Sequence, residues 1–353
     1  MNQDFVSALH EIVKEKGISE ELLFTTIEDS LVAAYKKNYS KGNITCHNVK
    51  ITMNRENGDI HVYAQKTVVE SALDDVNEIS LDAAKAIDPV YVIDDIVSIE
   101  VTPKQFGRVA AQAAKQVVVQ RLKEEERKII FGEFSEKAQD IITGTVLRKD
   151  KSNVLIDLGK TEAVLSSGEQ MPGEKYNFNE KLKLYIVEVK NTSKGAQIII
   201  SRTHPGLVKR LFELEVPEIY NGIVEIKGIA REAGSRSKIA VYSHDESVDA
   251  MGACVGTKGS RVQSIVNELK NEKIDIIKWS KLPEEFIANA LSPAKCIDVT
   301  IDENNKSTRV EVEDNQLSLA IGKEGQNVRL AAKLTGWKID IKNRTQVEEL
   351  NKE

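Results

Sequence analysis

Two stretches near the C-terminal end of the chain repeat one another, so any fold for this sequence must accommodate the same unit twice. Residues 256–276 read GTKGSRVQSIVNELKNEKIDI, and residues 322–341 read GKEGQNVRLAAKLTGWKIDI. Each copy opens with Gly-x-x-Gly, continues with apolar residues at helical spacing and closes in Lys-Ile-Asp-Ile. A lone Gly-x-x-Gly could be a helix cap. The shared frame, with first glycines 66 positions apart, favours duplication of a whole unit.

The residues before each copy extend the repeated unit. Two alternating apolar segments precede each Gly-x-x-Gly, and a helical stretch comes before them. The strand segments are 222–230 with 237–243 and 296–302 with 308–312, and the helical stretches are 204–215 and 283–291. The order helix, strand, strand, helix, Gly-x-x-Gly, helix, strand is that of the type II KH fold. In that fold the Gly-x-x-Gly loop clamps about four nucleotides of single-stranded RNA.

The two Gly-x-x-Gly loops are the candidate RNA-binding sites. A sugar-phosphate backbone must pass close to the main chain there, so a Cβ at either glycine would obstruct it. Each loop opens a helix, whose free N–H groups favour phosphate, and Lys258 or Lys323 adds positive charge. Glu324 in the second loop should weaken phosphate binding, so the first loop is expected to be the better clamp. Bases should lie against Ala253, Cys254 and Val255 in one unit and Leu319, Ala320 and Ile321 in the other.

The N-terminal third is expected to form a separate α+β domain. Two helices fill the first forty residues, and alternating segments at 44–53 and 60–69 flank Asn57-Gly58, a strong hairpin signal. A further apolar strand is expected at 90–101. A long helix that starts at 102–103 and ends near Gly132 should connect this domain to the next one.

The following segment changes to short strands separated by turn signals. Five strands with one longer connection suit an OB-type barrel. Such barrels often stack bases on aromatic side chains, but Tyr176, Phe178 and Tyr185 are the only aromatic candidates, so RNA binding by this barrel should depend on cations. The expected strands are 141–148, 152–158, 161–165, 181–189 and 196–202, and the cations are Arg148, Lys149, Lys151, Lys181, Lys183 and Arg202.

Charge is distributed unevenly along the chain. The net charge of -6 by itself argues mildly against a nucleic-acid binder. Residues 70–100 hold nine acidic residues and one basic residue and should repel phosphate, whereas residues 141–210 hold 12 Lys and Arg against seven Asp and Glu. A polyanion would therefore be steered to the middle of the chain.

Other functional classes find little support in the sequence. No stretch approaches the length of a membrane span and the N-terminus lacks a signal-peptide pattern, so a cytoplasmic protein without membrane partners is expected. Cys46, Cys254 and Cys296 are too far apart to indicate a disulfide framework or a redox site. The histidines show no metal-ligand spacing, and Cys46-His47 should lie in a strand. We predict no catalytic residue, no cofactor and no metal, and hence no enzyme.

Longer stretches carry a resemblance that covers nearly the whole chain. SRTHPGLVKRLFELEVPEI at 201–219, VEIKGIAREAGSRSKIAV at 224–241 and LSLAIGKEGQNVRLAAKLTGWKIDI at 317–341 resemble the NusA family of bacterial transcription factors. The resemblance implies an α+β multidomain protein with an N-terminal domain that docks on RNA polymerase near its RNA exit channel. An S-one-type OB barrel and two tandem type II KH domains would hold nascent single-stranded RNA. Such a protein would modulate pausing, termination and antitermination with other antitermination factors, and is expected to be a monomer.

The resemblance also implies domain limits and RNA contacts. The implied domains are 1–132 for polymerase binding, 133–202 for the barrel, 203–280 and 281–345 for the two KH domains, and 346–353 for a short tail. The implied loop contacts are Gly256, Thr257, Lys258, Gly259 and Arg261 in the first KH domain, and Gly322, Lys323, Glu324, Gly325, Asn327 and Arg329 in the second. Arg202 ends the barrel at a family position linked to RNA contact, and Arg231, Arg236 and Lys238 flank the first KH hairpin as secondary contacts.

Two other functions remain open from the RNA-binding modules alone. Polynucleotide phosphorylase, an RNA-degrading enzyme, also combines KH and S-one units, but in the opposite order and behind large catalytic domains. A ribosomal or translation RNA-binding protein would bind RNA without docking on polymerase. Some family members add acidic repeats after the second KH domain, and functions that depend on such repeats are not expected here.

Overall fold

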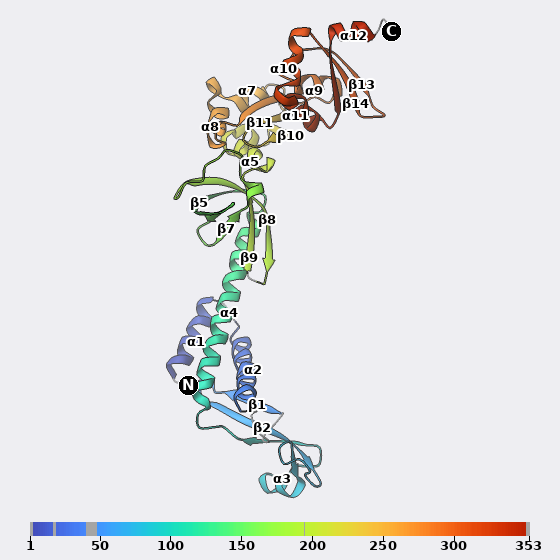
Figure 1. Ribbon diagram of the computed structural model, residues 1–353. Coiled ribbons are helices and arrows are strands. Elements are labelled where there is room, and N and C mark those ends of the chain that lie inside the picture. The colour runs from blue at the N-terminus through green and yellow to red at the C-terminus, as the bar shows by residue number, and fades with distance from the viewer. Residues whose placement is uncertain (1–2, 17–18, 40–47, 194, 351–353) are drawn as a thin grey trace. The chain divides into compact units, whose positions relative to one another are not determined.

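The computed structural model describes residues 3–16, 19–39, 48–193 and 195–350 (Figure 1). It divides into two compact units, Met1–Ile129 and Ile130–Glu353, which are described separately. No helix within the described ranges is long and apolar enough to cross a membrane.

The N-terminal unit combines helices with one small sheet. Strand β2 pairs antiparallel with β1 and β4 and parallel with β3. The elements are α1 (Gln3–Lys16), α2 (Glu20–Tyr39), β1 (Val49–Met53), β2 (Ile60–Val69), β3 (Glu78–Ser80), α3 (Leu81–Ile87), β4 (Ile96–Glu100) and the first part of α4 (Phe106–Glu136). The predicted hairpin turn is present between β1 and β2, where Gly58 has a φ of 75°.

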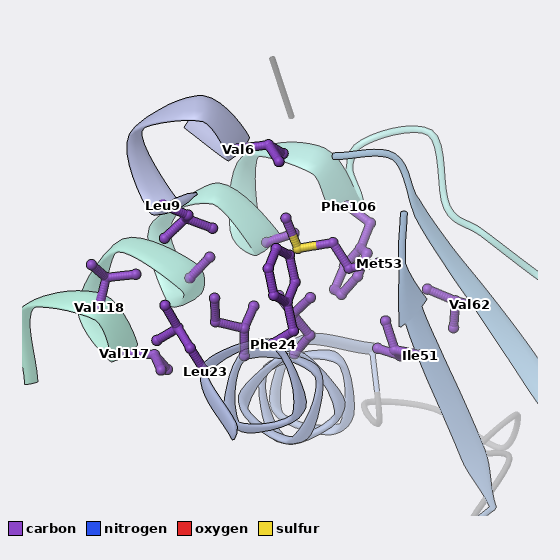
Figure 2. Packing of buried hydrophobic residues seen from close by; sticks show 14 of the residues in the cluster. Val6, Leu9, Leu23, Phe24, Ile51, Met53, Val62, Phe106, Val117 and Val118 are labelled. Atoms are coloured by element: carbon purple, nitrogen blue, oxygen red, sulfur yellow. The ribbon is translucent and has the colours of Figure 1, made fainter. Parts of the chain in front are cut away.

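The main core of this unit lies between the helices and one face of the sheet. Phe24 of α2 lies in the middle of the cluster, Leu23 of α2 lies beside Val117 of α4, and Ile51 and Met53 of β1 close the cluster from the sheet side (Figure 2). All five side chains are buried. Leu23, Ile27 and Leu31, which follow one another every four residues along α2, all face this core, as helical periodicity predicts.

The bounds of β4 and of helix α4, which continues into the second unit, differ from the sequence prediction. The strand expected at 90–101 is confined to β4, and a loop precedes it. Helix α4 begins at Phe106, because Pro103 lies in the preceding turn and its carbonyl accepts a hydrogen bond from the N–H of Phe106. The helix also continues through Gly132, beyond which Phe134 is buried in the barrel core. The expected strand position of Cys46-His47 lies outside the described residues.

The second unit begins with the predicted barrel. Its five antiparallel strands follow the order β7-β6-β5-β8-β9 in a nearly closed sheet, as in an OB fold. The strands are β5 (Ile141–Asp150), β6 (Asn153–Asp157), β7 (Glu162–Leu165), β8 (Lys181–Thr192) and β9 (Gly195–Ser201). Ile156, Leu184 and Ile186 fill the interior together with Phe134 from the end of α4.

Two smaller folding units of the same topology, called here the first and the second KH unit, follow the barrel within the second compact unit. The first contains α5 (Pro205–Glu215), α6 (Pro217–Tyr220), β10 (Val224–Glu232), β11 (Arg236–Ser243), α7 (Ala250–Val255), α8 (Ser260–Glu268) and β12 (Lys273–Lys278). The second contains α9 (Pro283–Ala290), β13 (Cys296–Asp302), β14 (Ser307–Val312), α10 (Leu317–Ile321), α11 (Gln326–Thr335) and β15 (Lys338–Asn343). In each unit the middle strand pairs antiparallel with the first strand and parallel with the last. This is the predicted KH arrangement, present twice.

The repeated Lys-Ile-Asp-Ile sequence forms most of the last strand of each unit. Successive side chains on a strand point to opposite faces. Ile274 and Ile276 accordingly pack against the helices of the first unit, and Ile339 and Ile341 do so in the second. Beyond β15, the expected short tail begins as helix α12 (Arg344–Leu350).

Candidate nucleic-acid interface

The two Gly-x-x-Gly loops have almost the same backbone conformation. Gly256 has φ 73° and ψ 176°, and Gly322 has φ 76° and ψ 171°. The third residue of each loop, Lys258 or Glu324, is left-handed, with φ 53° and 54° respectively. The last glycine of each loop is also left-handed. Each loop therefore turns the chain in the same way between two short helices.

The two glycines of a loop are required for different reasons. A Cβ on Gly256 would lie 2.7 Å from Cγ of Arg261, and a Cβ on Gly322 would lie 2.8 Å from Cβ of Asn327. A Cβ on the last glycine would meet only one valine methyl, at 4.0 Å, so space is open in front of it. The first glycine is thus needed for packing within the protein. The second glycine has open space in front of it, and contact of both glycines with RNA stays a prediction.

The helices that follow the loops begin without a side-chain cap. Gly259 precedes α8 and Gly325 precedes α11, and neither can supply a side chain to the first helical N–H groups. Those N–H groups and the helix dipole together favour an anion. Thr257 and Lys258 are exposed beside the first helix start, and Lys323 and Glu324 beside the second. The side chains of the first loop carry one positive charge, that of Lys258, whereas the charges of Lys323 and Glu324 cancel in the second loop.

Arg261 and Asn327 occupy equivalent positions and bind the protein itself. Nη1 of Arg261 donates to the carbonyl of Ala253 at 2.6 Å and to Glu218 at 2.9 Å. Nδ2 of Asn327, which is 1% exposed, donates to the carbonyls of Leu291, Leu319 and Ala320. Both side chains fasten the helix before the loop to the helix after it. These hydrogen bonds position the loops, and contact of Arg261 and Asn327 with RNA stays a prediction.

Arg329 links the second loop to the first KH unit. Its Nε donates to Glu232 on β10 at 2.6 Å, and its Nη1 donates to the carbonyl of Glu324 in the loop. Gln326 donates to the same carboxylate at 2.8 Å and to Ser235 at 2.7 Å. The Arg329 hydrogen bond holds the pKa of Glu232 below its ordinary value. The repeat alone did not reveal Gln326 and Glu232, because the contact joins two copies.

The apolar residues expected to form base-binding grooves are divided between surface and core. Cys254 and Ala320 are buried, and burial raises the pKa of the Cys254 thiol to about 12. Ala253 and Val255 are half-buried on one helix, and Leu319 and Ile321 are exposed on the other. Each short helix before a loop therefore buries its middle apolar side chain, and the second helix exposes the two flanking side chains more than the first does.

Arg202 is fully buried where the barrel meets the first KH unit. Its guanidinium donates five hydrogen bonds, to both oxygens of Glu174, to the carboxylate and carbonyl of Glu268, and to the carbonyl of Lys183. An arginine has five N–H donors, so all are used. Burial opposes the charge, but Glu174 and Glu268 together outweigh burial and raise the pKa of Arg202. The structure thus gives Arg202 a role in joining barrel and KH unit, and contact with RNA stays a prediction.

The secondary contacts beside the first KH hairpin are also engaged within the protein. Arg231 is buried against Glu272, whose carboxylate also accepts from Ser237 and from the N–H of Gly234. Lys238 is buried, and its Nζ donates to the carbonyl of Ser292 in the second KH unit at 2.7 Å. Burial lowers its pKa and Asp275 partly offsets this effect. Arg236 lies 3.3 Å from the same aspartate. Sequence charge alone could not distinguish these buried cations from surface ones.

The barrel offers cations but little aromatic surface. Arg148, Lys149 and Lys151 are exposed at the turn between β5 and β6. Tyr185 is buried and stacks on His204 with ring centroids 4.7 Å apart, and Tyr176 is buried as well. Phe178, at 74% exposed, is the one solvent-facing ring of the three aromatic candidates. No metal-binding cluster of His, Cys, Asp and Glu occurs among the residues that the structure describes.

Comparisons with known proteins agree with this geometry. Residues 4–128 match the NusA N-terminal domain, residues 202–279 the NusA-like first KH domain, and residues 283–349 the NusA-like second KH domain. The transcription termination/antitermination protein NusA of Halalkalibacterium halodurans is 58% identical over 99% of this chain and 91% of its own length. The NusA protein of Bacillus subtilis is 56% identical over 99% of this chain and 93% of its own.

One solved structure covers the N-terminal part. The solution structure of the N-terminal domain of NusA from Bacillus subtilis is 48% identical and covers 36% of this chain and 99% of that chain, with a TM-score of 0.32.

Proposed function

The chain belongs to the NusA family of transcription termination/antitermination proteins, and from this premise we propose that it acts on transcribing RNA polymerase as a guide for nascent RNA. The family and its KH domains make it a non-enzymatic transcription factor. Its N-terminal unit anchors the protein on polymerase near the RNA exit channel. Its barrel and two KH domains hold the emerging single strand, and this hold modulates pausing, termination and antitermination.

The duplicated loop geometry carries the RNA part of the proposal. Two loops with matching backbone torsions each end in an uncapped helix start, and each has open space before its second glycine. Such a site recognises a phosphate and the backbone around it rather than a base. Lys258 and Lys323 supply charge, while Arg261, Asn327 and Arg329 hold the loops in place. The first loop, which lacks a carboxylate, is the stronger clamp.

Tethering explains how weak clamps can suffice. A site anchored on polymerase meets the transcript at a high effective concentration, so each loop needs only modest affinity for free RNA. The low aromatic content of the barrel supports this reading, because stacking would otherwise add about 1–3 kcal/mol per base. The protein works as a monomer in the cytoplasm, together with other antitermination factors. We keep the domain limits 1–132, 133–202, 203–280 and 281–345 as part of the proposal.

A transcription assay with purified RNA polymerase tests this function. The full-length protein should change the dwell time at a hairpin-dependent pause or the efficiency of a terminator. Thr257→Asp with Lys258→Asp should remove most of that effect, because it reverses the charge of the first loop. Aspartate tolerates the left-handed conformation of Lys258, so the loop should retain its fold.

Lys306→Asp is the matched control for the charge reversal. Lys306 is also an exposed lysine with positive φ, but it lies in the β13–β14 turn, outside both Gly-x-x-Gly loops. It should keep the effect on pausing and termination. An unmodified protein with no effect on polymerase would contradict the proposed function, and a fully active loop variant would exclude the first clamp from it.

A further inference from the structure

An apolar segment of the N-terminal unit lies on the surface instead of in a core. Residues 87–96 read IDPVYVIDDI, and the apolar strand predicted at 90–101 includes most of them. The structure instead places a loop between α3 and β4, and five aliphatic side chains in and beside it are exposed. Their exposed fractions are 58% for Ile87, 81% for Val90, 59% for Val92, 42% for Ile93 and 54% for Ile96. Several exposed aliphatic side chains within one short segment are typical of an interaction site.

Hydrogen bonds hold this loop in its exposed conformation. The carboxylate of Asp88 accepts from the N–H of Val90 at 3.1 Å, and that of Asp95 accepts from the N–H of Val92 at 2.8 Å. Two backbone bonds then tie Asp94 and Asp95 to Val68 on strand β2. The loop is therefore a shaped surface in which the aspartates fix the backbone and the aliphatic side chains point outward.

The small core beneath the loop does not use these side chains. It consists of Val68, Ala84 and Val97, with Tyr91 from the loop packed against it. Tyr91 thus anchors the segment, while Val90, Val92 and Ile93 are free to contact another molecule. If a partner buried these side chains, the complex would gain about 25 cal/mol of free energy per Å² of apolar surface removed from water.

The charge around the loop selects the kind of partner. Residues 70–100 carry nine acidic residues and one basic residue, Lys85. This field repels the phosphates of RNA and attracts a surface that presents lysine or arginine. Asp94 and Asp95 lie within the loop itself, so the attraction acts at the edge of the apolar patch.

We propose that the 87–96 segment is a docking surface for a protein partner whose contact area is apolar and rimmed by lysine and arginine. This inference rests on the proposed function, under which the partner is RNA polymerase. Val90, Val92 and Ile93 form the apolar centre of the contact, and the surrounding carboxylates steer the basic rim into place.

Binding of purified core RNA polymerase to the immobilised full-length protein tests this surface. The triple variant Val90→Ser, Val92→Ser, Ile93→Ser should bind at least tenfold more weakly and retain the same thermal unfolding curve, since these side chains lie outside the core. The control Leu214→Ser with Leu282→Ser removes two side chains of the second unit that are each 63% exposed. It should bind polymerase as the unmodified protein does.

A charge variant tests the acidic rim separately. Asp82→Asn with Asp94→Asn should slow association with polymerase and flatten its dependence on salt concentration. Asparagine accepts the positive φ of 72° at Asp94, so the loop backbone is retained.

The possible outcomes separate the two proposals. If the unmodified protein fails to bind polymerase, the proposed function fails. If it binds and the triple serine variant binds equally well, the docking surface is wrong while the function stands. If the triple variant lost affinity for single-stranded RNA, the segment would be an RNA-binding surface instead. If the unmodified protein formed a dimer that the variant abolished, the segment would bind a second copy of the chain.

Discussion

Alanine at the two glycines of the first Gly-x-x-Gly loop should damage different properties of the protein. Gly256 has φ 73° and ψ 176°, a region that only glycine occupies readily, and a Cβ there would lie 2.7 Å from Arg261. Backbone strain of about 1–3 kcal/mol and overpacking of about 1–3 kcal/mol together give about 2–6 kcal/mol of destabilisation for Gly256→Ala. Gly259 is left-handed in open space, so Gly259→Ala should lose only about 1–2 kcal/mol.

For RNA binding we expect the opposite order: Gly259→Ala should lose more affinity than Gly256→Ala. The Cβ of Gly259→Ala would project into the space that a sugar-phosphate backbone must enter, so this variant should bind single-stranded RNA at least tenfold more weakly while it remains folded. Gly256→Ala should lose RNA binding only to the extent that the first KH unit unfolds.

Tryptophan fluorescence provides the stability assay. The chain has two tryptophans, and Trp279 follows the last strand of the first KH unit, where its N–H donates to the carbonyl of Val241. In a Trp337→Phe background, urea unfolding followed at Trp279 reports on this unit. Equal urea midpoints for the two alanine variants, or full RNA affinity in folded Gly259→Ala, would refute the division of roles between the glycines.

Two further predictions concern the contacts that join the domains. Arg202→Ala should destabilise the second unit by about 3–5 kcal/mol, because it leaves Glu174 and Glu268 without their buried partner, and the urea midpoint should fall accordingly. The pKa of Glu232 is lowered by Arg329, so the stabilisation it gives is complete above the ordinary carboxyl pKa and is lost as pH falls through the lowered value. The stability gap between the unmodified protein and Glu232→Gln should be constant above about pH 5 and shrink as the pH falls below the ordinary carboxyl pKa; a gap that widens in acid would contradict the ion pair.

Local periodicity was sufficient to predict most of the second unit. The repeat, the strand order and the closing Lys-Ile-Asp-Ile strand depend on apolar residues at fixed spacing, and each strand or helix buries the face that its pattern indicates. The nearly closed barrel could also be predicted from the sequence, since turn residues separate its strands. The long helix α4 was expected to end near Gly132, but Phe134 two residues later has a core to fill, and burial outweighs the weak helix propensity of one glycine.

The details of the site required tertiary contacts. A sequence shows that Arg202, Arg231 and Lys238 are cations, but their burial follows from distant carboxylates such as Glu174 and Glu272. For the apolar segment at 87–96, the sequence likewise does not show that its side chains are exposed. Its composition contributed to the prediction of an apolar strand at 90–101, whereas aspartate side chains hold its backbone in an exposed loop.

The salt dependence of RNA binding tests the central claim most directly. Single-stranded RNA should be titrated with the full-length protein over a series of salt concentrations, by fluorescence anisotropy. The logarithm of the association constant should fall linearly with the logarithm of salt, with a slope of about -0.7 per phosphate neutralised. Thr257→Asp with Lys258→Asp should make this slope shallower, and Lys306→Asp should leave it unchanged. Affinity that is independent of salt, or a slope that the loop variant does not alter, would contradict phosphate clamping by the Gly-x-x-Gly loop.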